Sequence, residues 1–416
     1  MIKSCKGFND LMPQEMASFR HVEAVFLETT AGWGYREVRT PVIEYLYLFT
    51  SAGTLTPGKL RRTYSFLDWD GWSGERVVLR PDATIPVARM YSECLGGEPQ
   101  ARLAYIANTF MFDDSGKKDR ERWQMGAEYI GASSAMADGE LVALALEVTE
   151  HLKVPGVRVR LSHSGLIAAL LEHSGLSQEE YRNIFDELLD GNEAAIEKVK
   201  DSNPQLARLL SLMLGMNGKS AGYLKNLKAL LGEALSGAQN VIDDFIATTE
   251  AIQALGVEYE INLAAAKGYE YYTGVIFHIL SGDEIIGGGG RYDNLIKLLG
   301  GDDTPAAGFA LYMDKLVKYS EFEPKESSRA TISLINTSER GARKVLALTQ
   351  RLRKEGYSVV LISGGDGIPE IESCPSISVN DEEPTYTLRY PGAGKTVQFT
   401  TEDELCSVLA RGVDLA

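Results

Sequence analysis

The sequence predicts an α+β protein: an antiparallel sheet flanked by helices, with a helical insertion and a C-terminal α/β module. Three observations support this prediction. Strand-like segments linked by short turns recur over 63–130, a pattern typical of antiparallel sheets. Residues 176–255 are instead rich in Leu, Ala, Glu and Lys at helical spacing. Beyond residue 330, strands and helices alternate as they do in α/β folds.

The composition is that of a globular protein with more than one domain. The chain has 416 residues, of which 44% are hydrophobic and 24% charged, close to the averages for globular proteins. The longest apolar runs are far shorter than the roughly 20 residues that a membrane span needs. The basic N-terminus lacks the apolar stretch of a secretory signal. We therefore expect a cytoplasmic protein with no membrane partner.

Neither a metal centre nor a disulfide is expected. The four cysteines form no CxxC pair, and their spacing with the five histidines is not that of metal ligands. We therefore expect reduced thiols and no cofactor. The formal net charge of −16 argues against nucleic acid as the main partner, because proteins that bind nucleic acid usually present a basic face.

The first domain is expected to begin with a helix and a short strand. Pro13 opens the helix predicted over 13–31. The segment 32–41 is a turn that feeds a strand, which Pro41 must end or place at a sheet edge. Further strands are predicted at Thr63–Asp68, Val77–Leu79, Arg102–Phe112, Gln124–Ile130 and Val157–Ser162, with helices over Ala83–Cys94 and Gly139–His151.

After the helical insertion, the first domain is expected to return to mixed structure. The predicted elements are strands at Glu258–Leu263 and Tyr271–Leu280, a glycine-rich turn, a helix over Asp293–Leu299, a loop over Asp302–Ala307 and a helix over Ala310–Tyr319. A polar segment with a proline, 321–329, marks a linker. The predicted domains are therefore 1–320, including the insertion at about 176–255, and 330–416.

The second domain is expected to be a small α/β module. Its predicted strands are Ala330–Ile335, Ser358–Ile362, Ser376–Val379, Thr385–Arg389 and Thr396–Thr400, and its predicted helices are Arg340–Glu355 and Thr401–Arg411. Thr401 is a residue type that caps helix N-termini.

Ile286–Asp293 is the densest cluster of unusual residues, with four consecutive glycines before Arg291. Glycine lets a backbone pass close to a ligand or to a packed strand. A tight strand-to-helix turn is the plain structural alternative. The run has the spacing of neither a phosphate-binding loop nor a dinucleotide fingerprint.

Tyrosines dominate the segment Lys267–Gly274. In a strand, Tyr269 and Tyr271 would lie on one face and Glu270 and Tyr272 on the other. Aromatic residues on an inner sheet face more often belong to the core. A buried tyrosine beside a carboxylate also suits a small polar cation.

Gln124 and Glu128 lie an even number of residues apart in a predicted strand, so both should point to one face. A solvated outer face is the alternative for this pair alone. An inward carboxylate needs a positive partner or must shift its pKa. The ammonium group of a bound amino acid would supply such a partner.

Together these segments resemble the histidyl-tRNA synthetase family of class II aminoacyl-tRNA synthetases. The resemblance covers about residues 6–318, and the C-terminal module weakly resembles an anticodon-binding domain. It implies a class II synthetase-like fold and, through motif 1, a homodimer unit. The matching segments are Lys6–Pro13 for the opening, Tyr35–Pro41 with Glu44 for motif 1, Arg80–Thr84, Tyr105–Asp113 and Gln124–Gly131 through motif 2, Lys267–Gly274 and Gly288–Asp293 for the histidine motifs, and Gly308–Leu316 for motif 3.

The resemblance also implies a set of histidine-binding residues. They are Asp82, Thr84, Gln124, Glu128, Lys267, Tyr271, Tyr272 and Tyr292. The first three would hold the α-ammonium group of histidine. Glu128 and Tyr272 would face its imidazole, with Tyr271 and Tyr292 as walls. Asp82 is one methylene shorter than the glutamate usual in the synthetases.

The positions that the family uses for adenylate chemistry are altered. Met111 replaces the motif 2 arginine, Asp113 follows as the acidic residue, and Lys315 and Lys267 replace two further arginines. Lysine lacks the bidentate fork of arginine. Loss of one such donor typically costs about 10²–10³ in rate. We therefore expect no catalytic residues and a protein that is not itself an enzyme.

A family of such relatives is the regulatory subunits of ATP phosphoribosyltransferase, which resemble histidyl-tRNA synthetase but lack aminoacylation. This resemblance implies a hetero-oligomer with the short-form catalytic subunit and histidine as feedback effector in the first step of histidine biosynthesis. A divergent histidyl-tRNA synthetase is the alternative, and a synthetase-like binding protein for another ligand is a third. From Arg329 onward there are 10 Lys/Arg against 12 Asp/Glu, so tRNA is not expected as a partner.

Overall fold

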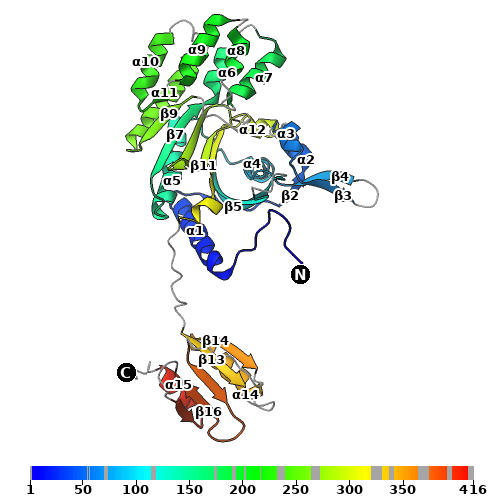
Figure 1. Ribbon diagram of the computed structural model, residues 1–416, viewed down its shortest axis with the longest axis vertical. Coiled ribbons are helices and arrows are strands. Elements are labelled where there is room, and N and C mark those ends of the chain that lie inside the picture. Colours follow the sequence, from blue (N-terminus) through cyan, green and yellow to red (C-terminus); the bar gives the residue numbers. More distant parts are fainter. Residues whose placement is uncertain are drawn as a thin grey trace. The chain divides into compact units, whose positions relative to one another are not determined.

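The computed structural model divides the chain into two compact units, Met1–Phe322 and Glu323–Ala416 (Figure 1). The linker predicted at 321–329 lies outside the described residues. The structure describes residues 2–53, 55, 57–69, 74–113, 119–172, 176–189, 194–200, 203–215, 217–231, 239–263, 272–319, 330–336, 342–363, 374–390 and 396–410.

A nine-stranded sheet forms the centre of the first unit (Figure 1), in the order β1-β5-β6-β12-β11-β10-β7-β9-β8. The run from β5 to β7 pairs antiparallel, as predicted, whereas β1–β5 and β7–β9 are parallel pairs. The strands are β1 (Arg36–Glu37), β5 (Ala101–Phe110), β6 (Glu121–Ile130), β12 (Ala306–Tyr312), β11 (Glu284–Arg291), β10 (Val275–Ser281), β7 (Val157–His163), β9 (Tyr259–Asn262) and β8 (Asn217–Gly218).

Two long helices, α1 (Pro13–Gly32) and α5 (Ala135–His151), pack on each other and on one face of this sheet. On that face, Arg102 of β5 donates two hydrogen bonds to Glu140 of α5. Arg102 pairs with Tyr129 in the ladder between β5 and β6. Since side chains alternate along a strand, Glu128 points to the opposite face.

Pro13 opens α1 as the sequence predicts. Proline suits the first helical turn because the N–H that it lacks would have no partner within the helix. The Glu15 carboxylate accepts a hydrogen bond from the Met12 N–H at 2.7 Å and so caps the helix start. Val22 and Phe26 then bury their side chains completely in the core.

A separate three-stranded antiparallel sheet consists of β2 (Ile43–Tyr45), β4 (Gly74–Leu79) and β3 (Ser65–Trp69). The strand-like segments of 63–130 therefore divide between two sheets. Two short helices, α2 (Leu46–Ser51) and α3 (Pro57–Leu60), lie next to it in the chain. The helix predicted over Ala83–Cys94 is present as α4 (Thr84–Met90) with a π-helical turn, Tyr91–Leu95.

The described residues of the insertion are almost all helical, and its first helix begins at Ser164, before the predicted start at about 176. Its two-residue strand β8 pairs with β9 and so extends the main sheet into the insertion. Its helices are α6 (Ser164–Glu172), α7 (Gln178–Leu189), α8 (Ala194–Lys200), α9 (Pro204–Gly215), α10 (Ala221–Leu231) and α11 (Gln239–Ala254).

Two predictions near the end of the first unit are wrong. The four glycines belong to strand β11 rather than to a turn, and α12 (Leu295–Leu298) follows after a short loop. The helix predicted over Ala310–Tyr319 is strand β12, followed by the one-turn helix α13 (Met313–Leu316). In both cases pairing to two neighbouring strands overrides the local preference of glycine and alanine.

The second unit is an α/β module with the predicted elements. Its sheet has the order β14-β13-β15-β16-β17, and its core includes Leu334, Leu348 and Leu405. Its elements are β13 (Thr331–Asn336), α14 (Ala342–Lys354), β14 (Ser358–Ser363), β15 (Ser376–Val379), β16 (Tyr386–Arg389), β17 (Thr396–Phe399) and α15 (Glu402–Ala410). Among the described residues, no helix is long and apolar enough to span a membrane.

Candidate functional site

Glu128 is the centre of a buried polar cluster on the sheet face opposite α1 and α5. Its side chain belongs to β6, and the residue is 1% exposed. The Tyr105 hydroxyl donates a hydrogen bond to Oε1 at 3.1 Å, and the Tyr292 hydroxyl donates one to Oε2. Thr84 Oγ1 lies 3.3 Å from the Tyr105 hydroxyl. We call Thr84, Tyr105, Glu128 and Tyr292 the Glu128 cluster.

Glycines on neighbouring strands make room for this cluster. Gly308 of β12 lies opposite Glu128 in the ladder, and a Cβ there would stand 1.6 Å from Glu128 Oε2. A Cβ on Gly126 would stand 2.3 Å from the Tyr105 ring. Both distances are far below van der Waals contact, so a larger residue at either position would displace a side chain of the cluster.

Gly290, in the glycine run of β11, the next strand of the sheet, likewise makes room for an aromatic side chain. Gly290 pairs with Gly308, and a Cβ on Gly290 would stand 3.0 Å from the Tyr272 ring. Tyr272 is buried, and its ring centroid lies 6.3 Å from that of Tyr292. The glycines therefore act within the sheet, where they let aromatic side chains lie against its face.

Burial controls the charge of the cluster. It raises the pKa of Glu128 to about 8, although the hydroxyls of Tyr292, Thr84 and Tyr105 lower that pKa in part. The nearby charge of Asp82 raises it further. Burial and the Glu128 carboxylate also raise the pKa of both tyrosines, Tyr105 and Tyr292. A cation that approached Glu128 would favour its ionised form.

Asp82 and Thr84 stand at the start of α4, beside the cluster. The Asp82 carboxylate accepts a hydrogen bond from the Ile85 N–H at 2.9 Å, so it caps this helix. Burial raises the pKa of Asp82. Thr84, itself a member of the cluster, is buried and contacts the Tyr105 hydroxyl. The structure therefore brings both residues close to Glu128.

Gln124 shares the face of Glu128, as the alternation along β6 predicts. It is half-buried and pairs in the ladders with Ala107 and Tyr312. Lys267 and Tyr271, the other two predicted site residues, lie outside the described residues. Six of the eight predicted residues are thus described, and their role in binding histidine stays a prediction.

Tyr105 is the member of the Glu128 cluster that the sequence did not single out. It lies on β5 and reaches Glu128 because it pairs with Gly126 in the ladder between β5 and β6. This pairing joins two residues that lie more than twenty positions apart in the sequence. Only alignment of the two strands on Glu128 would have identified it.

The segment after β5, where the synthetases bind phosphate, is held by main-chain contacts. The Phe112 N–H donates to the Arg62 carbonyl, and Arg62 Nε donates to the Phe112 carbonyl at 3.0 Å. Arg120 donates two hydrogen bonds to the Asp113 carbonyl, and its guanidinium stacks 4.2 Å from the Phe112 ring centroid. Met111, which follows the last residue of β5, has no positive charge with which to bind a phosphate.

Lys315, at the position of the motif 3 arginine, is also engaged. Its ammonium group donates to the main-chain carbonyl of Ile285 and lies 3.4 Å from the Glu284 carboxylate. Both partners belong to β11. In the structure, the ammonium group is therefore directed to groups of the protein itself.

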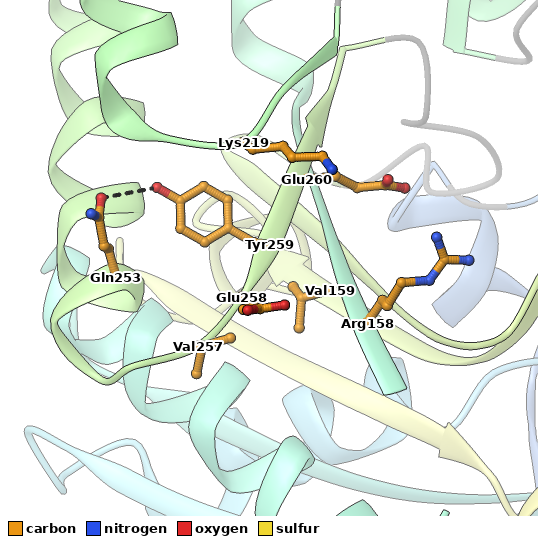
Figure 2. A pocket seen from close by; sticks show the side chains of 8 residues that line it. All are labelled: Arg158, Val159, Lys219, Gln253, Val257, Glu258, Tyr259 and Glu260. Carbon is orange, nitrogen blue, oxygen red and sulfur yellow. Dashed lines mark hydrogen bonds between the residues drawn. The ribbon is translucent and has the colours of Figure 1, made fainter. Parts of the chain in front are cut away.

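A cavity of 470 Å³ lies at the other end of the sheet (Figure 2). Arg158, Lys219 and Glu260 give it charges of both signs, and Tyr259 donates to Gln253 at 3.5 Å. Arg158 already contacts Asp283. Its described lining residues include none of the predicted histidine-binding residues.

Comparisons with known proteins agree with this geometry. The family model for histidyl-tRNA synthetase matches residues 7–316. The chain is 45% identical to the ATP phosphoribosyltransferase regulatory subunit of Dehalococcoides mccartyi over 99% of both chains. It is 32% identical to the histidine–tRNA ligase of Methanocaldococcus jannaschii over 87% of this chain and 86% of that protein.

A solved structure shows the same fold. It is described as an ATP phosphoribosyltransferase regulatory subunit/histidyl-tRNA synthetase from Bacillus halodurans, and it matches with a TM-score of 0.74 and 24% identity over 89% of this chain and 95% of that chain. The predicted class II synthetase-like α+β fold is therefore confirmed.

Proposed function

Because the chain belongs to the family of ATP phosphoribosyltransferase regulatory subunits, which share the histidyl-tRNA synthetase fold, we propose that it binds histidine and transmits feedback inhibition to a short-form catalytic subunit. The observation that carries this proposal is the Glu128 cluster. It is a buried carboxyl with a raised pKa, set among tyrosines at the centre of a sheet.

Histidine suits this cluster because it offers hydrogen-bonding groups at two ends. Glu128 and Tyr272 would face the imidazole, with Tyr271 and Tyr292 as walls. The α-ammonium would lie toward Asp82, Thr84 and Gln124, at the start of α4 and on β6. Lys267 completes the proposed histidine-binding set. A buried carboxyl favours a ligand that supplies positive charge or a hydrogen-bond donor.

The proposed protein is regulatory rather than catalytic. Adenylate formation needs preorganised cations at the phosphates. Met111 supplies none, and the Lys315 ammonium is engaged with the Ile285 carbonyl and Glu284. These contacts support a subunit that senses histidine without activating it.

A homodimer unit is part of the proposal. The outer face of the β2–β4–β3 sheet exposes the apolar side chains of Ile43, Tyr45 and Phe66, each 42–48% exposed. Tyr45 and Phe66 flank the buried Val77 in the ladders, and the half-buried Leu79 pairs with Ile43. A contiguous apolar surface of this kind marks a protein–protein contact. The same segment resembles motif 1, so we assign this surface to a second copy.

The decisive test is the activity of a purified short-form ATP phosphoribosyltransferase catalytic subunit with and without this protein. We expect strong activation that histidine reverses, because a ligand shifts an equilibrium only when it binds two states differently. The Glu128→Ala variant is expected to activate normally but to resist histidine.

Divergent histidyl-tRNA synthetase activity is the alternative, supported by the 32% identity to an archaeal histidine–tRNA ligase. Histidine-dependent ATP–pyrophosphate exchange separates the two. Robust exchange without activation of the catalytic subunit would replace the regulatory proposal by the enzymatic one. Absence of histidine binding in calorimetry at millimolar ligand would remove both.

A further inference from the structure

Arg80 is buried in the protein, and the hydrogen-bond partners of its guanidinium among the described residues are all uncharged oxygens. Nη1 donates to the Thr40 and Pro41 carbonyls at 2.9 and 3.1 Å and lies 3.2 Å from Thr40 Oγ1. Nε and Nη2 donate to the carbonyl and side-chain oxygens of Asn108 at 2.7 and 2.9 Å. One side chain therefore fixes the chain before β2 to strand β5.

Arg89, on α4, binds the same segment further along. Its guanidinium donates to the buried Glu44 carboxylate at 2.8 Å and to Glu93 at 2.6 Å. Glu44 lies on β2 and is 8% exposed. Two arginines, nine residues apart, thus hold both ends of the short segment Thr40–Tyr45.

The residues between the two arginines lead directly to the proposed histidine site. Asp82 caps α4, and Thr84 in its first turn contacts Tyr105. Tyr105 donates to Glu128. Movement of the stretch from Arg80 to Arg89 would therefore move side chains around Glu128.

The opposite side of Thr40–Tyr45 is exposed and apolar. Val42, Ile43 and Tyr45 are 38%, 48% and 42% exposed. The segment therefore faces the proposed second copy on one side and the two arginines on the other. Its position can respond to both an interface and a ligand.

We propose that Arg80 and Arg89 are positioning residues that couple Thr40–Tyr45 to the histidine site. Histidine, by fixing the start of α4 and β5, would hold this segment through the two guanidinium groups, and the segment would in return alter histidine affinity. Such coupling is necessarily reciprocal between two binding events. The inference rests on the proposed histidine binding and adds a route by which it reaches the subunit surface.

The geometry requires arginine rather than positive charge alone. Arg80 donates in several directions at once, to Thr40 and Pro41 on one side and to Asn108 on the other. A lysine has a single nitrogen and cannot bridge both sides. Arg80→Lys therefore keeps the charge and removes the link. Arg89→Lys keeps the charge but leaves one nitrogen in place of the two that bind Glu44 and Glu93, which weakens the second link.

Amide hydrogen exchange of Val42–Tyr45, with and without saturating histidine, tests the coupling in the full-length protein. In the wild type we expect histidine to slow exchange there by roughly tenfold, within the usual range of coupling between sites. In Arg80→Lys and Arg89→Lys we expect less than about twofold slowing and weaker histidine binding. Calorimetry measures the histidine dissociation constant of each variant.

Arg102→Lys is the matched control, because Arg102 pairs with Glu140 on the other face of the same sheet. It should retain the slowing seen in the wild type. Histidine binding in the wild type without any change in exchange at Val42–Tyr45 would overturn the coupling alone, and so would full slowing in both lysine variants. Absence of histidine binding in the wild type would overturn the proposed site and this inference together.

Discussion

The Glu128 cluster and the segment after β5 are neighbours in the first unit, yet their charged groups have different kinds of partner. Glu128 is buried, its hydrogen-bond partners among the described residues are hydroxyl groups, and burial raises its pKa to about 8. Near Met111 and at Lys315, two described cations have partners within the protein: Arg120 donates to the Asp113 carbonyl, and Lys315 contacts the Ile285 carbonyl and Glu284. If the Glu128 cluster binds histidine as proposed, the fold combines an amino-acid site with a neighbouring segment whose described cations already have partners within the protein.

We expect the largest effect from Gly308→Ala, because it would displace the Glu128 carboxyl from the cluster. Its Cβ would overlap Glu128 Oε2 at 1.6 Å, so the carboxyl must move from its hydroxyl partners. We expect a loss of about 1–3 kcal/mol in the free energy of unfolding and at least roughly tenfold weaker histidine binding. Denaturant unfolding and calorimetry measure the two effects.

Gly97→Ala is the control for that substitution, since nothing lies within 4 Å of a Cβ at Gly97. It should leave histidine affinity unchanged. Equal histidine affinity in Gly308→Ala and the wild type would show that the position of Glu128 does not matter for binding.

Glu128→Gln tests whether burial of the Glu128 carboxyl makes the stability of the protein depend on pH. The folded state raises the pKa of Glu128 from about 4.5 to about 8, so the folded protein binds more protons than the unfolded chain between these values. The wild type should therefore lose stability as pH rises from 5 to 8. Glutamine does not titrate, so this loss should be absent from the Glu128→Gln variant. In the wild type we expect the free energy of unfolding to fall by up to about 3 kcal/mol between pH 5 and pH 8 for this reason.

Urea unfolding of both proteins at several pH values measures that difference. An exposed carboxylate, Glu258, provides the matched Glu258→Gln control, for which the two stability curves should run parallel. Parallel curves for Glu128→Gln as well would mean that Glu128 is ionised in the folded protein at neutral pH.

Lys315→Met should have the smallest effect. The Lys315 side chain is 32% exposed and its partner Glu284 is 40% exposed, and such ion pairs contribute about 0–1 kcal/mol. We expect histidine affinity within about twofold of the wild type. A large loss of affinity, measured by calorimetry with ATP present, would show that Lys315 still serves a ligand.

Local patterns predicted most of the fold and part of the site. Alternation along one strand was enough to place Gln124 and Glu128 on a common face, and Pro13 marked the start of α1. The glycines of β11 and the alanine-rich strand Ala306–Tyr312 were misassigned because their conformation comes from pairing with distant strands. Tyr105 was missed for the same reason, since its role depends on register with Gly126.

The glycines beside Glu128 have a consequence for saturation mutagenesis. Gly126, Gly290 and Gly308 have no side chain, yet each lies next to a side chain of the proposed site: Tyr105, Tyr272 and Glu128, respectively. In a library selected for histidine response, these three positions should tolerate substitution as poorly as Glu128 does. A map of intolerant positions would therefore trace the outline of the site through residues that have no side chain.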